Sequence, residues 1–328
     1  MHPTWLLGVL GRWWVENECG TLPGMLQFGV SAWSTESAGA WTDMARTVEA
    51  EGFDTLLTAD HVGMLDPFAA LMAAAAATER IRLGTYVLNA EFWNPLLLAR
   101  AVATVDLLTG GRLLVGVGAG HAQVEFEQAG IRYGSPGERT RRLEAFVPAL
   151  RRLLAGETVT DHALGLRDAA TGITTAQHPV PLLVGGNGDR VLSTAARTAD
   201  AIGLVGFTSG TGRSHSDLSH WTWAGLEDRI GHVKQAAGGR LADLHLDLLV
   251  QLVAVTDDRA GTVGEFLGHP DLPVDMHLDS PFLLLGTEDE IAAQLERTEA
   301  LGVGGVTVFQ AHAALLAPVI GRLKGGTG

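Results

Sequence analysis

The chain has 328 residues, of which 46% are hydrophobic and 18% are charged. These values are typical of a globular protein with a large core and exclude a disordered chain. The 37 acidic and 23 basic side chains give a formal net charge of -14, which disfavours nucleic acid and anionic membranes as partners.

Cys19 is the single cysteine, which excludes an internal disulfide. The longest apolar run, residues 68–77, is shorter than the roughly 18 residues that span a bilayer. Residues 1–24 contain an apolar stretch, but acidic residues follow it and no basic segment precedes it. We therefore expect a flexible N-terminal extension here rather than a secretory signal. Residues 25–328 are expected to form one cytoplasmic domain.

Strands and helices alternate through the first half of the chain. Apolar stretches rich in β-prone residues predict strands at residues 26–31, 54–59, 81–88 and 112–118. Apolar spacings of three and four predict intervening helices at residues 40–52, 67–78, 94–109 and 137–155. In the third helix we expect a buried stripe of Leu98, Val102, Val105 and Leu108. In the fourth we expect solvated arginines, namely Arg139, Arg141, Arg142, Arg151 and Arg152.

The second half repeats this order after one interruption. Residues 156–180 show no clear period and predict an excursion from the main fold. Further strands are expected at residues 182–184, 200–205, 246–255 and 305–309, with helices ending near 198 and spanning 260–267 and 288–301. The polar residues 206–219 predict a mobile loop over the site. Eight strand-plus-helix units without a composition break predict an α/β fold, a (β/α)8 TIM barrel with insertion segments.

Asp60 and His61 follow the second predicted strand, at the end where parallel α/β folds place ligand chemistry. This pair suits general acid/base catalysis, because histidine titrates near neutrality and an adjacent carboxylate can bias its tautomer. The alternative is a structural histidine held by hydrogen bonds.

A glycine-rich segment, Gly185-Gly186-Asn187-Gly188, follows the fifth predicted strand and precedes a helix. Bare backbone N–H groups at the positive end of a helix suit a phosphate. A simple tight turn is the alternative, since glycine is common wherever the backbone bends.

Two groups of side chains have the chemistry of metal ligands. His121 and Glu125 are four residues apart and would share a helix face, but two ligands do not make a site. Asp275, His277 and Asp279 alternate between two prolines, which predict an irregular, solvated segment. We therefore expect no metal centre.

Together these motifs resemble the bacterial luciferase-like monooxygenase superfamily, and within it the F420-dependent oxidoreductases. The matching segments are Thr58–His61, Leu83–Asn89 with Asn94-Pro95, Gly110–Gly120, Val184–Gly188 and Leu285–Thr287. Their order is specific for the superfamily and less specific for the flavin. The resemblance implies a homodimer and a barrel whose central cavity holds a flavin or deazaflavin ring.

The resemblance also implies roles for individual residues. Tyr86–Val87 would be a non-prolyl cis peptide that presses on one face of the ring. The residues lining the ring would be Asp60, Asn89, Gly118, Ala119 and Gly120. The residues facing the phosphate would be Gly185, Gly186 and Gly188, with Asn187 in the same cofactor-binding segment. His61 matches the family's acid/base histidine.

The chain departs from the family's pattern at His121, where related enzymes carry a glutamate or tryptophan beside the ring. A cavity-facing His121 would give the site a second titratable catalytic group. Residues 156–180 also lack an evident counterpart of the hairpin that the family usually has there.

The leading hypothesis is an oxidoreductase that transfers hydride between coenzyme F420 and a small organic substrate, with His61 exchanging the proton. The nearest alternative is a monooxygenase that uses reduced FMN and O2 on the same fold. A metal-dependent barrel hydrolase would instead use His61, His121, His277 and Asp60. A cofactor-binding protein without turnover is the last alternative.

Overall fold

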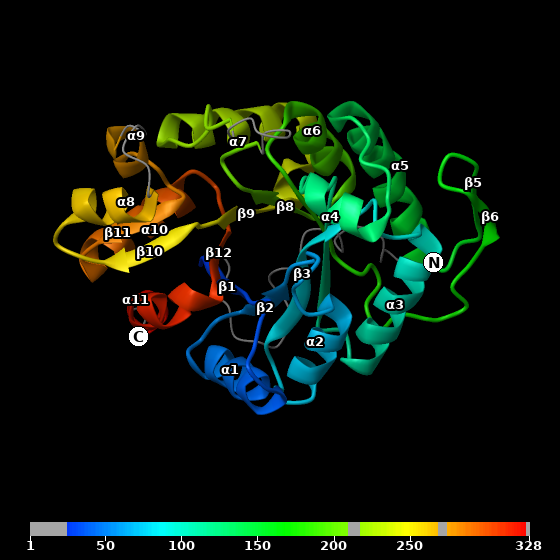
Figure 1. Ribbon diagram of the computed structural model, residues 1–328, viewed down its shortest axis with the longest axis horizontal. Coiled ribbons are helices and arrows are strands. Elements are labelled where there is room, and N and C mark those ends of the chain that lie inside the picture. Colours follow the sequence, from blue (N-terminus) through cyan, green and yellow to red (C-terminus); the bar gives the residue numbers. More distant parts are fainter. Residues whose placement is uncertain (1–24, 209–216, 268–273, 326–328) are drawn as a thin grey trace, which may run out of the picture.

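A closed barrel of eight parallel strands forms the centre of the computed structural model, which describes residues 25–208, 217–267 and 274–325 (Figure 1). Around the barrel, the strand order is β1-β12-β9-β8-β7-β4-β3-β2. The barrel strands are β1 (Gln27–Ser31), β2 (Thr55–Thr58), β3 (Arg82–Asn89), β4 (Leu113–Gly118), β7 (Leu182–Gly185), β8 (Ala201–Leu204), β9 (His245–Leu249) and β12 (Gly305–Phe309). The predicted TIM barrel is confirmed. The predicted extension, residues 1–24, lies outside the described residues.

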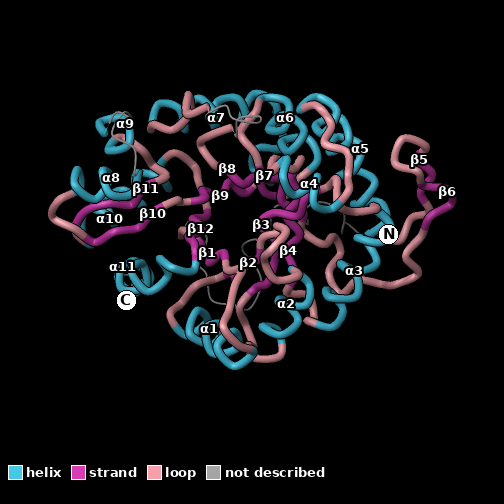
Figure 2. The backbone as a smooth tube through the Cα atoms, viewed as in Figure 1, coloured by secondary structure: helices cyan, strands magenta, loops and turns pink. Residues whose placement is uncertain are grey.

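Helices surround the barrel strands (Figure 2). The longer ones are α1 (Ala38–Ala50), α2 (Pro67–Ala75), α3 (Pro95–Leu108), α5 (Pro136–Leu154), α6 (Asp189–Thr198), α7 (Trp223–Ala237), α10 (Glu288–Ala300) and α11 (Ala313–Gly325). The shorter ones are α4 (Gln123–Ala129), α8 (Arg259–Leu267), α9 (Val274–Leu278) and the 3-10 turns η1 (Gly238–Asp243) and η2 (Gln310–His312). Their starts are set locally: the Asn94 side chain accepts hydrogen bonds from the first turn of α3, and Ser135 with Glu138 forms a capping box on α5.

The strand predicted at residues 246–255 is two strands with different partners. β9 pairs with β8 and β12 inside the barrel wall. β10 (Leu252–Val255) leaves the barrel and pairs in parallel with β11 (Leu283–Gly286). The single predicted strand is therefore wrong, because a β-prone segment does not reveal a change of partner along its length.

Residues 156–180 contain the hairpin that the sequence did not reveal. β5 (Val159–Asp161) and β6 (Leu166–Ala169) pair antiparallel and project from one side of the molecule (Figure 1). The expectation that this segment lacks a counterpart of the family's hairpin is therefore wrong. Strands of three and four residues are too short to show a two-residue period.

Two burial predictions on other segments are wrong. Leu108 is 65% exposed, and α3 instead buries Asp106, whose carboxylate accepts hydrogen bonds from Gln177. His277 is buried on the short helix α9, where a solvated, irregular segment was expected.

The arginines of α5 differ from one another. Arg141 and Arg152 are exposed, as expected. Arg139 is buried, and Arg142 and Arg151 are half-buried with their guanidinium groups on backbone carbonyls of other segments. Because backbone carbonyls accept from these guanidinium groups, the charged residue type did not imply a solvated position.

Candidate active site

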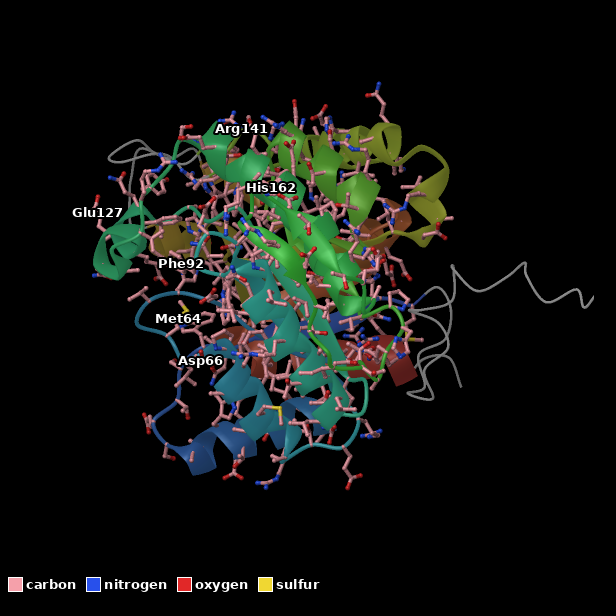
Figure 3. All side chains as sticks on the ribbon, turned by 90° about the vertical axis from the view of Figure 1, so that its right-hand side faces the viewer. Met64, Asp66, Phe92, Glu127, Arg141 and His162 are labelled. Atoms are coloured by element: carbon pink, nitrogen blue, oxygen red, sulfur yellow. The ribbon has the colours of Figure 1, made fainter. Side chains whose placement is uncertain are left out.

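A cavity of about 410 Å³ opens at the carboxyl ends of the barrel strands. In the side view, the labelled Met64, Asp66, Phe92 and Glu127, from the loops after β2 and β3 and from α4, lie at one end of the molecule (Figure 3). The structure places every residue predicted for catalysis or cofactor binding at this cavity: Asp60, His61, Tyr86, Val87, Asn89, Gly118, Ala119, Gly120, His121, Gly185, Gly186, Asn187 and Gly188. Sequence reasoning missed other lining residues, chiefly Arg139, Val191, Val205, Phe207, Thr208 and Leu249.

The inner end of the cavity is formed by the Tyr86–Val87 peptide, which we call the floor. This bond is cis, as the resemblance implied. The pairing of β3 with β4 changes register between Thr85 and Leu88, at the same place. A Cβ added to Gly118 would lie 2.8 Å from the Val87 side chain, and one added to Gly185 would lie 2.9 Å from it. Glycine is therefore required on the strands that face the floor.

Asp60 is held in place by two donors. Its Oδ2 accepts hydrogen bonds from the backbone N–H of Asn89 at 3.1 Å and from the Trp93 indole at 2.9 Å. Burial raises the pKa of Asp60, and the two hydrogen bonds oppose part of that rise. The Trp93 contact gave no signal in the sequence, because it depends on how the loop after β3 folds back.

His61 and Glu125 form a pair at the cavity wall. His61 Nδ1 lies 2.7 Å from Glu125 Oε1, and both side chains are largely shielded from solvent. Because a carboxylate only accepts, Nδ1 carries the proton and Nε2 bears the lone pair of the neutral ring. From the sequence, Glu125 was considered only as a possible metal ligand together with His121. Its contact with His61 was therefore not predicted.

His121 lies at the rim beside His61. Their ring centroids are 5.4 Å apart in an edge-on arrangement. His121 is reached by solvent but has many protein atoms around it, and this partial desolvation, with the neighbouring His61, lowers its pKa. The lowered pKa therefore favours the neutral form of the His121 imidazole.

The helix α4, which carries Glu125, is positioned by aromatic packing. Its N-terminus has no side-chain cap. Phe126 is fully buried, with ring centroids 5.0 Å from both Phe92 and Tyr133. Arg139 stacks over Tyr133 at 4.2 Å and donates to the carbonyl of Gly120 at 3.1 Å. These contacts join the loop after β4 to the start of α5.

The glycine segment after β7 leaves room for a ligand at the start of α6. Gly188 is the N-cap residue and provides no side-chain cap. A Cβ added there would meet nothing within 4 Å. The Asn187 side chain is buried with its Oδ1 lacking a hydrogen-bond partner. The open space and the backbone N–H groups at the start of α6 suit a polar ligand group such as a phosphate, whereas the unpaired Asn187 Oδ1 is an acceptor and suits a donor group.

Within residues 25–208, 217–267 and 274–325, no group of three or more His, Cys, Asp or Glu side chains is placed to hold a metal ion. His277, proposed for the hydrolase alternative, packs beside Trp221 with ring centroids 5.9 Å apart and does not line the cavity. The same part of the chain has no helix with the length and apolar character needed to cross a membrane.

The chain belongs to the luciferase-like monooxygenase family, whose family model matches residues 24–221. An F420-dependent glucose-6-phosphate dehydrogenase from Nakamurella multipartita is 32% identical over 250 residues, which are 72% of this chain and 70% of that protein. A protein of the same name from Intrasporangium calvum is 36% identical over 58% of this chain and 60% of its own length. A 5,10-methylenetetrahydromethanopterin reductase from Methanolobus tindarius is 27% identical over 54% of this chain and 53% of its own length.

Solved structures share the fold at lower identity. An F420-dependent secondary alcohol dehydrogenase has a TM-score of 0.74 at 18% identity, covering 91% of this chain and 99% of its own. A long-chain alkane monooxygenase has a TM-score of 0.69 at 15% identity, covering 92% of each chain. Dehydrogenases and monooxygenases thus share this fold, and the fold alone does not separate the two reactions.

Proposed function

We propose that this protein transfers hydride between coenzyme F420 and a small organic substrate. The observation that carries the proposal is the cavity itself, which joins a histidine-glutamate pair, the cis-peptide floor and an open glycine segment. The curated relatives with 32–36% identity are named as F420-dependent dehydrogenases, which favours F420 over FMN.

The residues present fit a flat cofactor with an anionic tail. Gly118 and Gly185 let the Val87 side chain pack closely against their backbone, and all three residues line the cavity beside the floor. The open space at Gly188 and the backbone N–H groups at the start of α6 would hold the anionic tail. The cavity volume of about 410 Å³ falls in the range of about 300–1,000 Å³ typical of small-molecule sites. When bound, F420 supplies a ring carbon, C5, that donates or accepts hydride.

His61 would act as the general acid and base. Its Nε2 has no hydrogen-bond partner among the described residues and can exchange a proton with the substrate. Glu125 would fix the ring orientation through Nδ1 and stabilise the imidazolium that forms when Nε2 is protonated. Val205, Phe207 and Leu249 line the same cavity with apolar atoms and would exclude water from the reacting groups.

His121 would act as a second polar group on the substrate. Its lowered pKa keeps it neutral near neutrality, so it can donate from one ring nitrogen and accept at the other. This role would distinguish the chain from relatives with a glutamate at the same position.

The decisive experiment is a titration of the purified protein with F420 and with FMN, followed by fluorescence. We expect micromolar or tighter binding of F420 and weaker binding of FMN. If neither binds at micromolar concentration, the proposed function is wrong. If F420 binds, turnover is measured with glucose-6-phosphate, the substrate in the names of three relatives, and with a panel of alcohols. Incorporation of labelled oxygen from O2 would favour the FMN alternative, and turnover lost in His61→Ala with binding retained would exclude a mere carrier.

A homodimer in the cytoplasm, without nucleic-acid binding, is part of the same proposal. The resemblance to F420-dependent enzymes supports the homodimer, and the net charge of -14 supports the lack of nucleic-acid binding. Light scattering of the purified protein tests the homodimer directly, because a mass near 34.5 kDa would indicate a monomer instead.

A further inference from the structure

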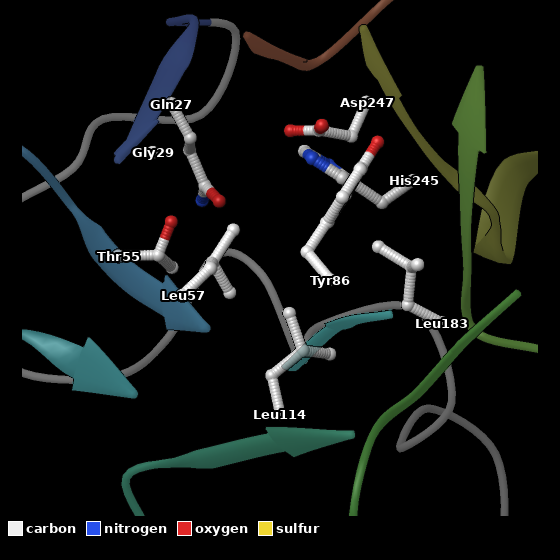
Figure 4. A pocket seen from close by; sticks show the side chains of 9 residues that line it. All are labelled: Gln27, Gly29, Thr55, Leu57, Tyr86, Leu114, Leu183, His245 and Asp247. Carbon is white, nitrogen blue, oxygen red and sulfur yellow. The ribbon is translucent and has the colours of Figure 1, made fainter. Parts of the chain in front are cut away.

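The barrel also encloses a second, much smaller cavity near the amino ends of its strands (Figure 4). Its volume is about 10 Å³, the lower limit of what a single water needs. The Tyr86 hydroxyl, which reaches this cavity, donates a hydrogen bond directly to the Asp247 carboxyl. The small cavity therefore has no room for a ligand, which leaves the large cavity at the carboxyl ends of the strands as the better place for a further ligand group.

Arg139 is the only lysine or arginine among the described residues that line the large cavity. The residue is 6% exposed, and it forms no ion pair with an acidic side chain in the described part of the chain. Arg142 and Arg151, on the same helix α5, each lie within ion-pair distance of a carboxylate. A buried cation without a counter-ion is costly, so Arg139 favours an anion in the cavity.

The guanidinium group of Arg139 has one edge left for a ligand. Its Nε donates to the Gly120 carbonyl at 3.1 Å, and its Nη1 donates to the Gly134 carbonyl. The Tyr133 ring covers one face at 4.2 Å. Nη2 donates to no acceptor among the described residues, yet it is not one of the polar atoms that the protein seals off without a partner. Because Arg139 lines the cavity, the N–H groups of Nη2 are available to a bound ligand.

The charge of Arg139 acts on His121 at the rim of the cavity. Burial, the neighbouring His61 and the Arg139 cation lower the pKa of His121, and Glu125 opposes part of this effect. An anion bound to Arg139 would offset the positive charge and raise the pKa of His121. The His121 ring is therefore a built-in reporter of anion binding at this position.

We propose that Arg139 binds an anionic oxygen group of the ligand, a carboxylate or a phosphate, through its Nη2 group beside His121. A guanidinium group suits such a partner because its planar N–H groups match the oxygens and the charges attract. Two sources carry this chemistry, namely the anionic tail of the cofactor and an acidic group on the substrate. The anion site stands independently, whereas its assignment to cofactor or substrate rests on the proposed function.

The first test titrates the purified protein, without cofactor, with inorganic phosphate and follows the His121 ring signal by NMR. We expect phosphate to shift this signal toward the protonated form. Arg139→Gln removes the charge, and the phosphate concentration for half-maximal shift should rise at least tenfold. Arg139→Lys, which keeps the charge but loses the planar fork, should give a smaller rise. Arg151→Gln is the matched control and should behave as the wild type, because Arg151 donates to the Thr198 carbonyl and does not line the cavity.

The same titration in the presence of saturating F420 identifies the source of the anionic group. If the cofactor tail occupies the site, F420 abolishes the phosphate response and Arg139→Gln weakens F420 binding at least tenfold. If the substrate provides the anion, the phosphate response persists in the F420-loaded protein, and F420 binds to Arg139→Gln within twofold of the wild type.

Two results would overturn the proposal. One is a phosphate response of His121 at the same concentration in the wild type and in Arg139→Gln, or in neither protein, which would leave Arg139 a structural role only. The other needs no folded variant: a phosphate-soaked crystal of the wild type without density at hydrogen-bond distance from Nη2. If the wild type binds neither F420 nor FMN, the proposed function fails, and the phosphate experiments alone decide the anion site.

Discussion

Replacing Asp247 with asparagine should change how the stability of the protein depends on pH. In the folded protein, burial raises the pKa of this carboxyl to about 7, whereas an unfolded aspartate releases its proton near pH 4. Between these two pH values the unfolded chain binds fewer protons than the folded one, so the free energy of unfolding falls as pH rises. At about 1.4 kcal/mol per pKa unit, the full loss is about 4 kcal/mol, complete above pH 7.

The assay is urea unfolding of the wild type and of Asp247→Asn at intervals from pH 4 to pH 8.5. Other titrating groups, including His245, act on both proteins and cancel in the difference between the two unfolding free energies. We expect the unfolding free energy of the variant, relative to that of the wild type, to rise by several kcal/mol between pH 4 and pH 7. Above pH 7 the difference should stay level. A difference that is flat across the whole range would refute the reasoning, because it would mean that the carboxyl ionises equally easily in both states.

Three further substitutions, one of them with a matched control, give separate tests. Thr307→Val removes a donor at 3.1 Å from the same carboxylate, so the pH range over which stability falls should extend above pH 7 in the same unfolding series. Gly188→Ala should weaken F420 binding about tenfold or more with little change in melting temperature, because its Cβ enters open space beside the cavity. Gly231→Ala, on the exposed side of α7 with nothing within 4 Å, is its matched control and should stabilise the protein by about 0.5–1 kcal/mol without affecting F420. Glu125→Gln should lower turnover at saturating F420 about 10- to 100-fold, the worth of one charge-assisted hydrogen bond, and unchanged turnover would remove the glutamate from the mechanism.

The barrel could be predicted because each unit carries local signals. Asn94-Pro95 marks the start of α3 and Ser135 with Glu138 marks the start of α5, and apolar stretches mark the strands between the helices. The errors arose where tertiary partners decide the outcome. β10 leaves the barrel and pairs with β11, and four apolar residues do not show which strand they pair with.

The candidate site also contains some residues whose roles the sequence predicted and others whose roles it did not. Residues at strand ends, such as Asp60, were found because the barrel brings all carboxyl ends of its strands to one face. The roles of Trp93, Glu125 and Arg139 were missed, since Glu125 and Arg139 reach the cavity, and Trp93 reaches Asp60, from loops or helices whose direction depends on packing. Arg139 illustrates the cause: its charge predicts solvent, while two backbone carbonyls and the Tyr133 ring hold it inside.

The proposed acid/base pair therefore depends on packing outside the barrel wall. His61 is placed by the end of β2, but Glu125 belongs to a helix of seven residues that is too short to be stable alone. Phe126 anchors that helix between Phe92 and Tyr133, so the 2.7 Å contact between His61 and Glu125 depends on an aromatic cluster whose residues do not line the cavity. Changes in this cluster would alter proton transfer without altering any residue of the barrel, which lets one fold support different reactions.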